Sequence, residues 1–176
     1  MITSIISILM LCLECIGGQP GGEAQLDDIQ GVFKLAKYVS WPNEDQMTTT
    51  TIMILPQSDE SYKTAESLAS GSRILNSVIS LKRIETCDDD IDNANIIFIE
   101  SGTSIDIDKV LQKTANKQIL TITNDLEILE KGCMFYVKHE QGTEQILYFY
   151  NKDAILASPL SISSHILTPD HKYEKK

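Results

Sequence analysis

The chain has 176 residues, of which 42% are hydrophobic and 23% are charged, values that fit one globular domain with a core of its own. Its formal net charge of −10 argues against nucleic-acid binding, which needs clustered Lys and Arg, and equally against direct binding to anionic lipids. The composition by itself names no substrate.

The first segment of the chain has the pattern of a secretory signal peptide. Residues 2–13 are nearly all apolar, and Gly and Pro residues follow between positions 17 and 22. This run is shorter than the ~20 residues of a membrane span but suits the core of a signal peptide. Gly22 and Ala24 supply the small residues that a signal peptidase reads, so we expect residues 1–24 to be removed and Gln25 to begin an exported protein. No Lys or Arg precedes the apolar run, which leaves a buried helix as the alternative.

Residues 27–131 alternate between helical and strand patterns. Asp27 and Asp28 can begin a helix whose apolar residues recur at helical spacing as far as Val39, and Trp41-Pro42 ends it. Short apolar runs predict strands at 52–55, 78–84, 96–99 and 119–122. Helical spacing predicts further helices at 58–70, 106–117 and 124–131, and a glycine follows the first and the last of these.

The pattern changes after Gly132. Residues 133–138 and 145–150 are typical of two hairpin strands with a longer loop, and Asn151 can cap a helix that reaches Ser158. We expect a last short helix at 162–167 and a polar tail at 171–176. Alternating strands and helices followed by a hairpin predict a single three-layer α/β domain over residues 25–170. Its sheet should be mostly parallel, with helices on both faces and a C-terminal antiparallel hairpin.

The sequence lacks the motifs of common enzyme sites. No glycine-rich phosphate loop follows the first strand, and no G-x-S-x-G nucleophile elbow is present. His139, His165 and His171 are scattered, without the spaced partners of a zinc site. Ser163 and Ser164 beside His165 are interpreted as helix-capping serines and not as a catalytic pair. We therefore expect no catalytic residue, no metal and no cofactor.

One segment, Asp88–Asn93, has a composition that could serve a cation. Calcium loops place oxygens at alternating positions, with a glycine at the bend and a distal Glu. Here the glycine is absent and the carboxylates are adjacent. A solvated acidic loop is therefore the preferred interpretation.

Two further positions are candidates for partner or ligand contacts. Glu100, Ser101, Thr103 and Ser104 follow the strongest buried-strand pattern, at the edge where open α/β sheets bind ligands, and they could hold an anion or a small polar ligand. An ordinary turn that begins the next helix is the alternative. Trp41, the only tryptophan, is expected to pack in the core, with an exposed aromatic anchor for a partner as its alternative.

The four cysteines form two groups. Cys12 and Cys15 lie in or beside the apolar segment, without the strand–helix context of a redox motif. Cys87 and Cys133 would remain in an exported protein, where an oxidising compartment could join them within one chain or between two. A bridge needs Cα atoms closer than about 7 Å, and nothing in the sequence fixes their distance. Free thiols are preferred, with Cys133 packed as a small apolar residue.

Five segments in order resemble the YfiR-like family. Val32–Pro42 resembles the helix ending in F-x-K-F/Y-V-x-W-P that opens these domains. Ile119–Asn124 is similar to the family's L-T-V-S-D strand, and Lys131–Phe135 to its G-G-x-I-x-F turn, with Cys in place of the second Gly. Tyr148–Asn151 and Ile162–Leu167 are similar to F-x-I-N and I-S-S-x-L-L. Each motif alone is short, but together they span residues 32–167.

This resemblance implies a periplasmic regulatory protein. The named member is a repressor that restrains an inner-membrane diguanylate cyclase through the extracytoplasmic region of that enzyme, and other members are encoded with different membrane sensors. The resemblance therefore implies a non-enzymatic protein that binds and inhibits a membrane-bound signalling protein, such as a diguanylate cyclase or a sensor kinase. A homodimer is left open. The alternative function is a small-molecule sensor with its ligand at the Glu100–Ser104 strand end.

Overall fold

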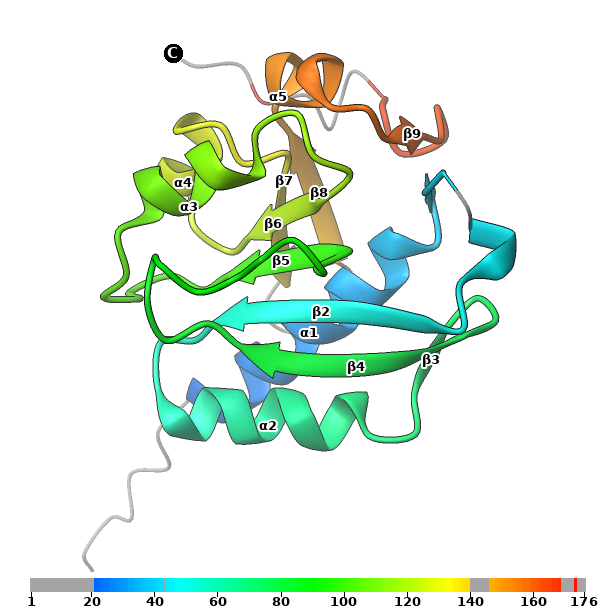
Figure 1. Cartoon of the computed structure of the whole chain (residues 1–176). Helices are drawn as coiled ribbons and strands as arrows, with labels where there is room; N and C mark the ends of the chain where they lie inside the picture. Colours follow the sequence, from blue (N-terminus) through cyan, green and yellow to red (C-terminus); the bar gives the residue numbers. More distant parts are fainter. Residues whose placement is uncertain (1–20, 43, 140–145, 169–172, 174–176) are drawn as a thin grey trace, which may run out of the picture.

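A computed structural model describes residues 21–42, 44–139, 146–168 and 173 of the chain. In these residues the main sheet has seven strands in the order β3-β4-β2-β5-β6-β7-β8 (Figure 1). The strands from β4 to β7 in this order run parallel, and β3 and β8 are antiparallel strands at the two edges. The bounds are β2 Thr49–Leu55, β3 Arg73–Ile74, β4 Ser77–Arg83, β5 Ile96–Ile99, β6 Leu120–Thr123, β7 Phe135–His139 and β8 Ile146–Tyr150.

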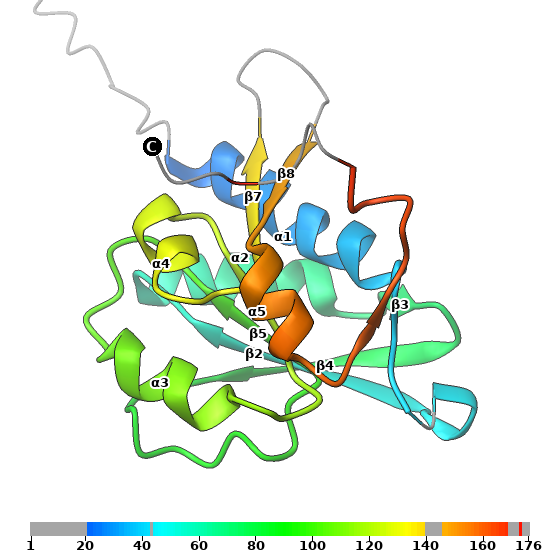
Figure 2. The ribbon, with the colours of Figure 1, turned by 90° about the horizontal axis from the view of Figure 1, so that it is seen from above.

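Helices cover both faces of this sheet, as Figure 2 shows from above. Helices α1 (Gly21–Ala36) and α2 (Asp59–Ala69) pack on one face, against inward side chains such as Ile52, Ile54 and Phe98. On the other face, α3 (Ile107–Thr114) and α4 (Leu126–Glu130) cover Met53, Leu55 and Ile97. Successive residues of β2 and β5 thus point to opposite cores, which explains why these strands are continuous apolar runs. The predicted three-layer α/β class with a mostly parallel sheet is confirmed.

Helix α1 approaches the sheet closely because it carries a glycine. A Cβ atom at Gly31 would lie 2.6 Å from the Val137 side chain on β7 and 3.1 Å from Ile146 on β8. Such distances are shorter than van der Waals contact, so a larger residue would push the helix from the strands. Glycine costs helix propensity at this position, and the close packing offsets that cost.

Side-chain caps place the helices much as the sequence predicts. Ser58 caps α2, Asp106 caps α3, Asp125 caps α4, and Asn151 caps α5 (Lys152–Ala157). In each case a side-chain oxygen accepts a backbone N–H of the first turn, a group without a partner inside the helix. The predicted antiparallel hairpin is confirmed as β7 and β8; residues 140–145 of its loop lie outside the described residues.

Two predicted helix segments are wrong, for one shared reason. The first helix ends at Ala36 and not at Val39, and residues 162–167 do not form a helix. Val39–Ser40 is strand β1 and Ser161–Ile162 is strand β9, and the two pair antiparallel. The N–H of Ser163 also donates to the Tyr38 carbonyl at 2.9 Å. Pairing between distant segments here overrides the local helical spacing, as is common for β-branched residues.

The terminal predictions fall partly outside the described residues. The signal-peptide core at 2–13 and most of the polar tail 171–176 lie there. The expected cleavage after Ala24 would fall within α1, because this helix begins at Gly21. Export and cleavage therefore stay predictions.

Candidate functional site

The strand order reverses between β2 and β5, which makes this pair of strands the topological switch point of the sheet. From β2 the chain crosses to β4 on one side, and from β4 it crosses back to β5 on the other. The carboxyl ends of β2 and β5 are the point where open α/β sheets usually bind ligands. Gln57 and Ser58 follow β2 at this edge, and Glu100 follows β5. The structure therefore places the predicted Glu100–Ser104 segment at the switch point of the sheet.

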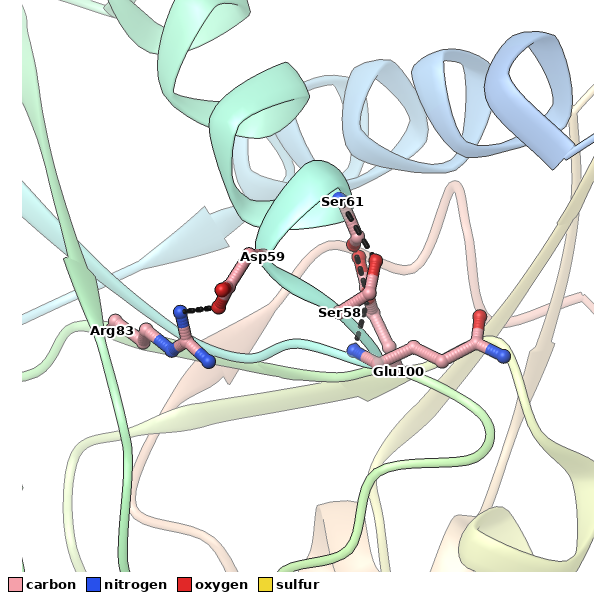
Figure 3. Close-up of polar contacts among 6 residues, drawn as sticks. Ser58, Asp59, Ser61, Arg83 and Glu100 are labelled. Carbon is pink, nitrogen blue, oxygen red and sulfur yellow. Dashed lines mark hydrogen bonds and ion pairs between the residues drawn. The ribbon is translucent and has the colours of Figure 1, made fainter.

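The Glu100 carboxylate lies at this switch point, and the protein itself supplies its hydrogen-bond donors. Its side chain is 3% exposed and accepts the backbone N–H of Gln57 at 2.7 Å. The hydroxyl of Ser61, in the first turn of α2, donates to the same carboxylate oxygen. Figure 3 shows Glu100 beside Ser58 and Ser61 at the start of α2. A negative charge is favourable at a helix N-terminus, so Glu100 takes the place that an anionic ligand would otherwise use.

A second set of hydrogen bonds links Ser101, the residue after Glu100, to α1 through Asn124. The backbone N–H of Ser101 donates to Oδ1 of Asn124 at 2.7 Å, and Nδ2 of Asn124 donates to Asp28 at 2.9 Å. The Ser101 hydroxyl donates to Asp125 at 2.9 Å. Desolvation by burial raises the pKa of Asp28, and the nearby Glu100 carboxylate raises it further, while the Asn124 hydrogen bond acts in the opposite direction. This edge of the sheet is thus acidic and internally bonded.

The remaining predicted contact residues have different surroundings. The Thr103 hydroxyl is buried without a hydrogen-bond partner in the described residues, and Ser104 is exposed. Sequence reasoning missed Asp28, Ser61 and Asn124. Asn124 could have been found, because it directly follows β6, the buried strand next to β5. Asp28 on α1 and Ser61 on α2 could not, because only the three-dimensional fold brings these helices to this edge of the sheet.

The acidic segment Asp88–Asn93 forms a loop that bonds to itself. Asp89 accepts the backbone N–H groups of Glu85 and Thr86 at 2.7 and 3.2 Å, which lowers the pKa of its carboxyl. Asp92 pairs with Lys117, which likewise lowers its pKa. Most of the segment is exposed, in accord with a solvated loop. Within the described residues no group of three or more acidic, His or Cys side chains is arranged to hold a metal.

Cys87 and Cys133 are both free thiols in the structure and belong to the core under α3 and α4. Cys133 is buried, and this burial raises the pKa of its thiol to about 12. Its predicted role as a small apolar core residue is confirmed. Cys87 packs against the same core but is partly exposed. Pairing of the two in an oxidising compartment is a separate question and stays a prediction.

The strand order shows the fold class, and a comparison with known protein families shows the family. A family model described as YfiR/HmsC-like matches residues 28–168, which is most of the described fold. The chain belongs to this family. No curated protein matches it. The YfiR/HmsC-like family is known for periplasmic regulators of diguanylate cyclases and is regulatory rather than catalytic.

Two features of the structure bear on the membership of this chain in the YfiR/HmsC-like family. Among the described helices, none is long and apolar enough to cross a membrane. Trp41, in the W-P segment that resembles the family motif, is 7% exposed and packs in the core, which confirms the preferred interpretation of this residue. The match covers α1 through β9 and therefore both cores of this YfiR/HmsC-like domain.

Proposed function

We propose that this protein binds the extracytoplasmic region of a membrane-bound signalling protein, such as a diguanylate cyclase or a sensor kinase, and lowers its output. The observation that carries the proposal is the family match over residues 28–168. The hydrogen bonds of Glu100 agree with it, because this side chain lies at the switch point, where such a sheet topology usually holds a substrate or nucleotide. The protein then acts by contact and not by catalysis.

Export is part of the proposal. The apolar run at 2–13 and the small residues Gly22 and Ala24 predict removal of residues 1–24. The periplasmic character of the family supports the same compartment. N-terminal sequencing of the protein from a periplasmic fraction should begin at Gln25; an intact Met1 in the cytoplasm would contradict export.

For the partner contact we propose Leu156 on α5. It is the most exposed large apolar side chain in the described residues, at 72%. Its helix is held firmly, because Nδ2 of Asn151 donates to the Leu129 carbonyl at 3.0 Å and its Oδ1 accepts two N–H groups of the first turn. Ala154 and Ile155 pack onto the core from the same helix. A rigid apolar side chain of this kind is suited to fill a pocket on a partner.

Of the contact residues predicted from the sequence, Trp41 and Glu100 are buried and lie below the surface that a protein partner touches. Ser101, Thr103 and Ser104 stay candidates at the carboxyl edge. The alternative function, a small-molecule sensor at this edge, keeps one favourable observation in the unpartnered Thr103 hydroxyl. It is less favoured because Glu100 and Ser101 already use their polar groups within the chain.

Site-specific photo-crosslinking tests the contact. A photoreactive side chain at position 156 should cross-link the intact protein to a membrane signalling protein in cells. One at the exposed Lys63 on α2, which lies far from α5 (Figure 1), serves as the control and should give no such adduct. Mass spectrometry of the adduct identifies the partner. Adducts from position 156 that contain only a second copy of this chain, or no adduct at all, would contradict the proposal.

A further inference from the structure

A hollow of about 600 Å³ opens at the amino-terminal ends of β5 and β6, on the opposite edge of the sheet from Glu100. Trp41 lines it together with residues of the segments that precede these two strands. We call it the Trp41 hollow. Its volume lies within the roughly 300–1,000 Å³ of small-molecule sites. No part of the proposed regulatory function uses it.

Trp41 supplies the first indication that a ligand belongs there. The side chain is 93% buried, being 7% exposed, yet its indole N–H has no hydrogen-bond partner in the described part of the chain. Most buried donors in native proteins are paired, and a bound water or ligand commonly completes those that the chain leaves open. Trp41 thus combines a place in the wall of the hollow with an indole N–H that the described chain leaves unsatisfied.

Carboxamide side chains supply the second indication. In the described part of the chain, four of them line the hollow: Asn93, Asn95, Asn116 and Gln118. Oδ1 of Asn95 accepts the Thr51 N–H at 2.8 Å, which fixes this side chain and leaves its Nδ2 as a donor. Asn116 has a left-handed backbone with φ of 60°, a conformation that Asn tolerates better than most residues. Carboxamides both donate and accept hydrogen bonds, as hydroxyl groups do.

The charges at the hollow cancel. Among the described residues, Lys117 is the only basic one that lines it, and its ammonium group is paired with the Asp92 carboxylate, which also lines it. An anionic ligand would meet the Asp92 charge and a cationic ligand the Lys117 charge. The apolar part of the lining comes from Trp41, Met47, Ala94 and Ile119. We propose that the Trp41 hollow binds a small, uncharged, hydroxyl-rich ligand of the sugar or polyol class. Its hydroxyls meet the carboxamides, and its carbon skeleton meets the apolar lining.

The experiment uses Trp41 as its own reporter, because it is the only tryptophan in the chain. Maltose, cellobiose and sorbitol are titrated into the intact protein at millimolar concentrations, with glucuronate and glucosamine as charged counterparts. At least one neutral probe should shift the tryptophan emission saturably, and calorimetry should give the same dissociation constant. Asn116→Gly keeps the left-handed backbone and removes one carboxamide, so it should weaken binding about three- to tenfold.

The control variant is Gln112→Ala, an exposed α3 carboxamide outside the hollow, which should bind as the wild type does. Gln118→Ala is a second test that does not alter a left-handed residue. Absence of saturable binding by all three neutral probes would overturn the proposal, as would binding of the charged probes alone. Neutral-probe binding that is unchanged in both Asn116→Gly and Gln118→Ala would place the ligand elsewhere and would also overturn it.

Discussion

Glu100 at the end of β5 accepts the backbone N–H of Gln57 at the end of β2, at 2.7 Å. This one hydrogen bond, with that from Ser61, joins the two strands at the point where the sheet topology reverses. In many open α/β folds a ligand binds at this switch point. In this YfiR/HmsC-like domain the Glu100 side chain lies there, and its hydrogen bonds stabilise the fold.

Replacing Glu100 with Ala should therefore destabilise the domain. The substitution leaves a backbone N–H and the buried Ser61 hydroxyl without their acceptor, which costs about 2 kcal/mol of unfolding free energy. Glu100→Gln retains an acceptor oxygen and should cost less. Urea unfolding measures both, with Glu66→Ala on the exposed side of α2 as control. If Glu100→Ala lowers the free energy of unfolding no more than the control does, this carboxylate does not stabilise the contact between the ends of β2 and β5.

Asp28 should make the domain less stable as pH rises. Burial raises its folded pKa above the ordinary value of 3.8, so the folded state holds a proton that the unfolded state releases. Stability is then lost from about pH 3.8 upward, through the raised pKa, by about 1.4 kcal/mol for each unit of difference. Asp28→Asn removes this titration, so the stability of the variant relative to wild type should increase between pH 3.5 and pH 7. A difference that is constant or decreases over this range would contradict the burial of Asp28.

Trp41→Phe should cost little stability for a buried aromatic. The indole N–H has no partner, so its removal breaks no hydrogen bond within the described residues. The smaller ring leaves a small void, and we expect a net loss of about 1 kcal/mol or less, against about 3–5 kcal/mol for Trp41→Ala. Denaturant unfolding followed by circular dichroism measures both variants. Equal losses would mean that the N–H is satisfied by a tightly bound group that survives purification.

Cys87 and Cys133 should react at very different rates. Burial raises the pKa of the Cys133 thiol to about 12, so almost no thiolate is present at pH 8, whereas Cys87 is partly exposed. A thiol reagent should modify Cys87 in the folded protein and both thiols in denaturant without reductant. Periplasmic protein that shows no reactive thiol in denaturant, as a monomer, would reveal a Cys87–Cys133 bridge.

The central strands β5 and β6 were predictable because each is buried on both faces. Ile96–Ile99 reads as a strand from its sequence alone, since every residue of it enters one of the two cores. The β1–β9 pair was not predictable, because Val39 and Ile162 fit a helical spacing locally and only their pairing makes them strands. Two-residue strands leave no periodicity to read.

The candidate site, like the fold, was only partly predictable from the sequence. Glu100 could be singled out because it ends the best strand pattern, but its partners Gln57 and Ser61 are 43 and 39 residues away along the chain. Gln57 and Ser61 lie close to Glu100 because β2 and β5 are neighbours in the sheet. A single sequence does not show which strands are neighbours. The exposure of Leu156 is likewise a property of how α5 docks, because its neighbour Ile155 is packed on the core.

The output of the partner is the most direct measure of the central claim. The membrane protein cross-linked through position 156 is purified in a lipid nanodisc, and its product formation, such as cyclic-di-GMP synthesis or autophosphorylation, is followed as the mature protein is added. The account predicts a saturable decrease with wild type and with the α2 control Lys63→Asp, and little or none with Leu156→Asp, which places a charge on the exposed anchor. Unchanged output at saturating wild-type protein, or equal inhibition by Leu156→Asp, would contradict it.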